Sequence, residues 1–91
     1  MEYRIEFPEA MDDYGWSVQE AKGWLDVTVV WEGGERVLNI YDQNRLMKAA
    51  EVDLGRLGYF AVTSLVVVRK VTLEDIESAV AAIADRGFVH I

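Results

Sequence analysis

The sequence predicts a two-layer α/β (α+β) sandwich, in which a mixed sheet of about five strands carries two helices mainly on one face. Three observations predict it. A Gly-Gly pair separates two strand-like segments, apolar residues recur at helical spacing in two later segments, and a valine-rich run lies between those two later segments. The expected element order is β-β-β-α-β-α-β. The chain has 91 residues, so we expect a single domain over residues 1–91.

The N-terminal third predicts one strand and one ambiguous connection. Residues 2–7 alternate between apolar and charged side chains, which predicts a half-buried strand that stops at Pro8. The following segment, residues 8–23, is open to three interpretations. Ser17 and Glu20 have the spacing of a capping box for a short helix, whereas the alternation around them suits a further strand, and a packed loop is the third interpretation.

A hairpin is predicted around Gly33-Gly34, because two glycines supply the positive φ angles of a tight turn. The flanking strands are residues 24–31 and 35–41, and a two-glycine loop pairs Val30 with Val37. One face of this hairpin then points away from the helices. That face carries Trp24, Asp26, Thr28, Val30, Val37, Asn39 and Tyr41, and the opposite face carries Leu25, Val27, Val29, Leu38 and Ile40.

The rest of the chain predicts two strand–helix–strand units. A helix is expected from Asp42, as its N-cap, to Gly58, with an earlier end at Gly55 as the alternative. Residues 60–70 are expected to form a strand covered on both faces. A second helix begins at Thr72 and ends before Gly87.

Residues 88–91 are expected to form the last strand of the sheet. Two helices cannot cover both faces of a five-stranded sheet, so the predicted fold leaves part of one face open.

Charge is distributed unevenly along the chain. Sixteen acids and nine bases give a net charge of −7. Residues 1–42 carry ten acids and three bases, whereas residues 43–91 carry six of each, so the net charge lies in the first part. Binding to nucleic acid requires clustered lysine and arginine, which this chain lacks, and we expect no nucleic-acid partner. An acidic chain attracts cationic partners instead.

The sequence also carries no signal for export or membrane insertion. The first residues are acidic where a signal peptide is basic, and the longest apolar run, Ala79–Ala84, is too short to span a bilayer. The chain has no cysteine, which suits a reducing compartment. We therefore expect no membrane partner and a cytoplasmic location.

No catalytic constellation is found in the sequence. His90 is the only histidine, and no orienting partner is arranged around it for catalysis, so we interpret it as a solvated or hydrogen-bonded residue of the expected last strand. The glycines form neither of the common phosphate-binding loops. Asp12 and Asp13 are not set in a regular calcium-binding loop. We expect no enzymatic activity, no cofactor and no metal site.

Carboxylates and aromatic residues together predict a site for a basic protein partner. Tyrosine and tryptophan beside carboxylates are typical of interfaces that hold arginine or lysine. A solvated acidic loop, and burial of the rings over the open face, are the simpler interpretations of the same residues. The candidate partner-binding residues are Glu9, Asp12, Asp13, Tyr14, Trp16, Trp24, Asp26 and Tyr41.

In size, acidic charge and element order, the chain resembles the small acidic immunity and antitoxin proteins of bacterial toxin systems. The acidic first part and the Glu9–Trp16 segment carry this resemblance, which implies that the candidate residues mask a basic partner such as a nuclease toxin. Two alternatives stay open. One is a homo-oligomeric accessory protein that dimerises through the open sheet face. The other is a domain that binds a small ligand with Asp26 and Glu20 beside Trp24.

Overall fold

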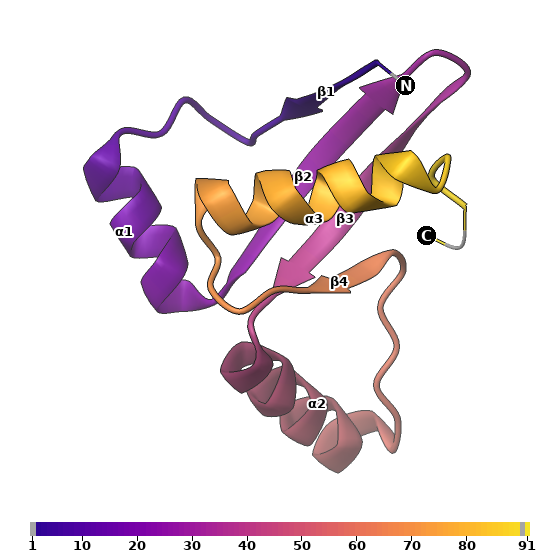
Figure 1. The fold of residues 1–91 in the computed structure, drawn as a ribbon. Coiled ribbons are helices and arrows are strands. Elements are labelled where there is room, and N and C mark those ends of the chain that lie inside the picture. Colours follow the sequence, from indigo (N-terminus) through magenta and orange to yellow (C-terminus); the bar gives the residue numbers. More distant parts are fainter. Residues whose placement is uncertain (1, 90) are drawn as a thin grey trace.

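The structure is an α+β fold with a four-stranded mixed sheet and three helices (Figure 1). It is a computed structural model, and it describes residues 2–89 and 91. The elements are β1 (Tyr3–Glu6), α1 (Asp13–Lys22), β2 (Trp24–Trp31), β3 (Gly34–Tyr41), α2 (Gln43–Leu57), β4 (Leu65–Val67) and α3 (Leu73–Asp85). The sheet order is β1-β2-β3-β4; β4 pairs parallel to β3, and the other two pairings are antiparallel.

One helix covers one face of the sheet. In Figure 1, α3 crosses in front of β2 and β3, and its residues Ile76, Val80 and Ala84 are buried. We call this the covered face, and the opposite one the open face. The core between α3 and the sheet consists of Leu25, Val27, Val29, Leu38, Ile40, Val68, Val71, Ile76, Val80, Ala84 and Phe88.

The prediction that two helices lie mainly on one face is therefore wrong for the helix expected from Asp42 to Gly58, which is α2 (Gln43–Leu57). Helix α2 has the predicted bounds and the predicted N-cap, since Asp42 accepts a hydrogen bond from the Arg45 amide at 2.8 Å. It nevertheless lies beyond the end of the sheet in Figure 1, and none of its residues is buried. No helix among the described residues is long and apolar enough to cross a membrane.

The ambiguous segment 8–23 forms a helix, α1. Its N-cap is Asp12, whose carboxylate accepts from the Gly15 amide at 2.8 Å. Ser17 lies inside the helix, where its hydroxyl donates to the carbonyl of Asp13 at 3.0 Å. The helix ends at Gly23, which has a φ of 74°. The second element of the chain is thus a helix and not a strand.

The hairpin is present, but its register differs from the prediction by two residues. Thr28 lies opposite Val37, and the turn falls on residues 32–33, so Gly34 belongs to β3. A shift of two residues keeps every side chain on its predicted face. The physical reason is the indole of Trp31, because a Cβ on Gly34 would lie 3.0 Å from that ring. Gly34 thus leaves room for the indole beside the strand.

The expected last strand is also wrong. Among residues 88–91, the described ones form no strand, and His90 lies outside the described residues. Gly87 and Phe88 both have positive φ, and this turn brings the Phe88 ring back onto the sheet. There it stacks on Trp31 at 4.1 Å and meets Tyr3 edge-on at 5.9 Å. Without that strand, and with residues 60–70 contributing only β4, the sheet has four strands among the described residues.

Substituting Gly23 by alanine should destabilise the fold more than substituting Gly58. Both glycines end helices with positive φ, which costs alanine about 1–2 kcal/mol. Only at Gly23 would the new Cβ also meet the Asp42 carboxylate, at 2.6 Å, and so disturb the cap of α2. We expect Gly23→Ala to cost about 1 kcal/mol more than Gly58→Ala, as measured by urea unfolding. Equal losses of stability in the two variants would show that the Asp42 side chain moves away from the new Cβ at no cost.

Removing the Phe88 ring should nearly abolish folding. Phe88 is 5% exposed, and Phe88→Ala should cost about 3–5 kcal/mol, a large fraction of the stability of a small domain. Val89 is 53% exposed, so Val89→Ala should change stability by less than about 0.5 kcal/mol. Thermal unfolding of both variants checks this, and a mild effect of Phe88→Ala would mean that the C-terminal turn does not support the core.

Candidate functional site

The predicted partner-binding residues separate into two groups in the structure. Glu9, Asp12, Asp13 and Tyr14 lie at the N-terminal end of α1. Three of them, Glu9, Asp12 and Tyr14, line a hollow of about 670 Å³ together with Met11 and Val18 of the same segment. Tyr14 is 77% exposed, so its ring is available for contact. We call these four residues the α1 group.

The second group lies on the open face, beyond the C-terminal end of α1. Trp24 and Tyr41 are directly opposite each other in neighbouring strands, with ring centroids 6.4 Å apart. Asp26 is the next residue of β2 on the same face, opposite Asn39. We call Trp24, Asp26 and Tyr41 the sheet group. The length of α1, about 15 Å for ten residues, separates the two groups.

Trp16 belongs to neither group. Its ring meets Phe7 edge-on at 5.3 Å and packs against the core, as Phe7 does. The tryptophan of α1 is therefore a structural residue, while the neighbouring Tyr14 is exposed. The interpretation that both rings fold over the open face is wrong for Trp16, because its ring partner Phe7, which follows β1, packs against the core as Ile5 does.

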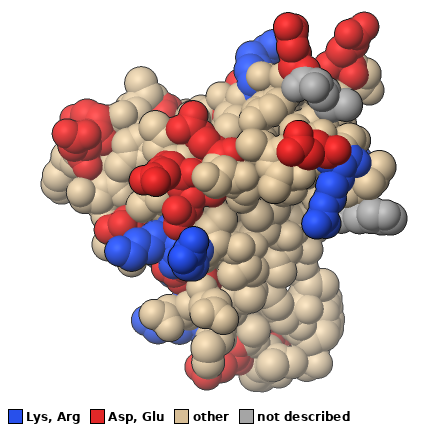
Figure 2. Space-filling view, in the orientation of Figure 1, with Lys and Arg blue, Asp and Glu red and all other residues tan. Residues whose placement is uncertain are grey.

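Several acids of the N-terminal part have structural roles in the fold. Asp12 and Asp42 cap helices, and Glu6 accepts from the Arg4 guanidinium at 3.0 Å. The charge does not form one continuous surface. Figure 2 shows acidic side chains gathered around α1 and the start of α3 and again toward the hairpin end, with an expanse almost free of charge over β4 and the connection before it. Among the acids of the two groups, Asp26 is the one that lies on the open face.

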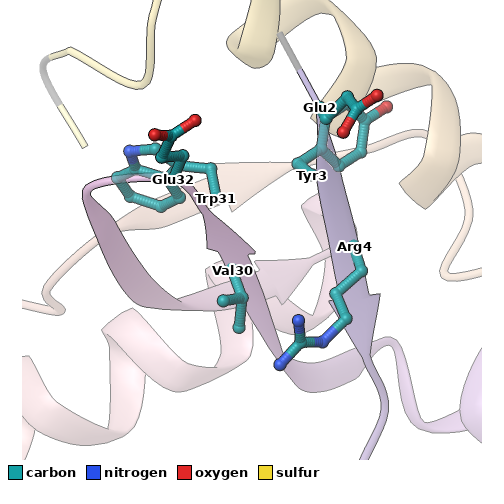
Figure 3. A pocket seen from close by; sticks show the side chains of 6 residues that line it. All are labelled: Glu2, Tyr3, Arg4, Val30, Trp31 and Glu32. Atoms are coloured by element: carbon teal, nitrogen blue, oxygen red, sulfur yellow. The ribbon is translucent and has the colours of Figure 1, made fainter.

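A further hollow, of about 950 Å³, lies between β1 and the end of β2 (Figure 3). Its lining includes two acids, Glu2 and Glu32, and the base Arg4. The guanidinium of Arg4 is held by Glu6, which is not part of the lining. Sequence reasoning did not identify this hollow, because it depends on the pairing of β1 with the far end of β2.

Four buried polar atoms have no hydrogen-bond partner among the described residues. They are Gln19 Oε1, Trp24 Nε1, Asp26 Oδ1 and Ser64 Oγ. Two of them, on Trp24 and Asp26, belong to the sheet group. Ser64 lies nearby, because it precedes Leu65 of β4, and Leu65 pairs with Asn39, which in turn pairs with Asp26. Buried polar groups in proteins are normally satisfied. Sequence reasoning missed Gln19 and Ser64, since no sequence signal marks them.

The sheet group can hold a cation. The ammonium of Lys22 lies 5.2 Å from the centre of the Trp24 ring, which is a cation–π distance. The carboxylate of Asp26 and the edge of Tyr41 lie in the neighbouring positions of the same face. Among the described residues, no three histidine, cysteine or acidic side chains are close enough together to hold a metal ion. The arrangement suits recognition of a basic side chain.

Replacing Asp26 by threonine should raise the free energy of unfolding. Threonine suits a strand better than aspartate, and the change removes a buried acceptor without a hydrogen bond, so we expect a gain of about 0.5–1 kcal/mol. The reverse change two residues along the same face, Thr28→Asp, should lower stability by a similar amount. Urea unfolding measures both. Lower stability of Asp26→Thr would show that the carboxylate supports the fold.

Comparison of the chain with protein families, with curated proteins and with solved structures finds no match. The functional assignment therefore rests on the geometry of this chain.

Proposed function

We propose that the chain is a protein-binding module whose open sheet face receives a basic segment of a partner protein. The observation that carries this proposal is the sheet group, in which an aromatic pair lies beside a carboxylate that has an unpartnered oxygen. The Asp26 side chain is half-buried and its unpartnered Oδ1 is covered, so an incoming guanidinium or ammonium would satisfy this oxygen once the side chain turned toward the partner.

The aromatic pair supplies the flat contact that a basic side chain needs. Arginine stacks on aromatic faces and can donate to a carboxylate at the same time. Lys22 already lies over Trp24 from within the chain, so a cation is compatible with this ring. A partner's arginine that displaced Lys22 would gain the Asp26 carboxylate as a second contact.

The overall charge would guide such a partner to the molecule. A net charge of −7 attracts basic proteins over a distance of about 10 Å at moderate salt and raises the association rate. The α1 group, with Tyr14 exposed in its hollow, offers a second contact for the same partner. Two separated contacts suit a broad basic surface better than a short peptide.

The same features support a more specific proposal, that the chain masks a basic partner as an immunity or antitoxin protein does. Its small size, its acidic charge and the resemblance noted above support this role. A basic nuclease-like toxin is the class of partner that fits, because such an enzyme uses clustered arginine and lysine to bind phosphates.

Charge reversal on the open face tests the proposal. Asp26→Lys should abolish retention of the basic partner on a column of the immobilised chain. Glu35→Lys makes the same charge change on the same face, four residues away along the sheet opposite Val30, and should keep most of the retention. Retention on the wild-type column should fall as salt is raised. The proposal fails if both variants bind alike or if retained proteins are acidic.

The α1 group is tested with Asp13 and not with Asp12. Asp12→Lys would remove the cap of α1 and lower stability by about 0.5–2 kcal/mol, which would confuse the readout. Asp13→Lys leaves the cap in place and should slow association without a large change in the dissociation rate, as measured by surface plasmon resonance. An unchanged association rate would exclude this end of α1 from the path of approach.

A further inference from the structure

Helix α2 presents an apolar stripe that the rest of the described chain covers only in part, since Leu46 and Ala50 are half-buried and the other members are exposed. The stripe consists of Leu46, Met47, Ala50, Leu54 and Leu57, which recur three and four residues apart on one side of the helix. Met47, Leu54 and Leu57 are 61%, 56% and 50% exposed. An isolated helix of 15 residues is marginal in water, and α2 has no fully buried side chain, so an added contact along the stripe would stabilise it.

We propose that α2 is the seam of a symmetric homodimer, in which the stripe of one copy packs antiparallel against the stripe of a second copy. This goes beyond the proposed function, because the stripe is separate from the sheet group and from the α1 group. The dimer uses the end of the molecule to which α2 projects in Figure 1.

The molecule's surface area is consistent with one missing interface of ordinary size. The chain exposes 6265 Å², which is roughly 900 Å² more than a compact monomer of this mass is expected to expose. A standard protein interface buries about 800 Å² on each partner. The radius of gyration is 13.7 Å, against about 12 Å expected for a compact domain of this length. Covering α2 would remove part of this excess.

The centre of the stripe is self-complementary, which favours a second copy over a different protein, although Met47 and Leu57 fall opposite Asp53 and Gln43 in this register. Leu46 and Leu54 lie four residues on either side of Ala50. In an antiparallel pair centred on Ala50, Leu46 of each copy meets Leu54 of the other, and the small central alanines let the helices approach to about 8 Å. A two-fold axis requires such reciprocal contacts, because a contact from Leu46 of one copy to Leu54 of the other must also occur with the two copies exchanged.

Charge also permits association at this place and opposes it elsewhere. Helix α2 carries three bases, Arg45, Lys48 and Arg56, and two acids, Glu51 and Asp53. It is therefore slightly basic on a chain of net charge −7. Two copies that meet along α2 keep their acidic N-terminal parts away from the seam, which limits repulsion between them.

Sedimentation equilibrium of the full chain tests the proposal. The wild type should approach twice the 10.3 kDa mass of one chain as its concentration rises from micromolar to submillimolar. Leu54→Lys should weaken the dimer more than about tenfold. Val52→Lys is the matched control, since Val52 is 59% exposed but lies about 200° around the helix from Leu54. A wild type that stays at the mass of one chain, or equal weakening by both variants, would overturn the proposal.

Cross-linking tests the antiparallel register. The chain has no cysteine, so a single introduced thiol reports one position only. Ala50→Cys should form covalent dimers with a short thiol-reactive cross-linker, because the axis passes beside this residue, whereas Val52→Cys should not. Cross-linking of both to the same extent would overturn the register. Leu54→Lys should still retain the basic partner and Asp26→Lys should still dimerise, so that failures of the two proposals are distinguishable.

Discussion

The packing of one helix on one face of a small sheet is the constraint on which the rest of the structure depends. Ile76, Val80 and Ala84 of α3 close the covered face, and the ring of Phe88 completes the layer by stacking on Trp31. All the fully buried side chains belong to this single layer or to the segment that leads into α3. One helix cannot also cover the opposite face, so the open face and α2 remain uncovered.

What could be predicted from the sequence was what local chemistry determines. Asp42 and Thr72 are N-caps as predicted. An N-cap is predictable because its side chain accepts a hydrogen bond from a backbone amide only three residues later in the chain. The two faces of the hairpin were also predictable, because alternation fixes the side of each residue whatever the register. For that reason Trp24, Asp26 and Tyr41 share one face as expected.

What could not be predicted depends on contacts between distant residues. The register of the hairpin depends on the placement of the Trp31 indole, which stacks on Phe88. These two residues are 57 positions apart in the sequence. The last segment turns back because Gly87 and Phe88 both adopt positive φ, and a bulky residue rarely does so. In the candidate site, the α1 group is separated from the sheet group because α1 is a helix. The sequence could not predict that helix, because none of its residues is buried and it therefore has no clear apolar pattern. The unpartnered atoms of Gln19 and Ser64 depend on tertiary packing in the same way.

The uncovered surfaces give the fold its functional interpretation. The open face carries a carboxylate beside two aromatic rings, and α2 carries an apolar stripe whose centre is self-complementary. Both features cost the isolated chain stability, the first through an unsatisfied acceptor and the second through apolar surface left in water. Both costs would be removed by binding, one by a basic partner and the other by a second copy.

The central claim is that the α3 layer holds the fold together while α2 depends on association. Native-state hydrogen exchange at two protein concentrations tests this claim most directly, because it reports the opening free energy of each helix separately. The amides of α3, β2 and β3 should exchange slowly and equally at both concentrations. Those of α2 should exchange rapidly in dilute solution and slow down as the concentration rises. Amides of α2 that are as protected as those of α3 in dilute solution would contradict the account.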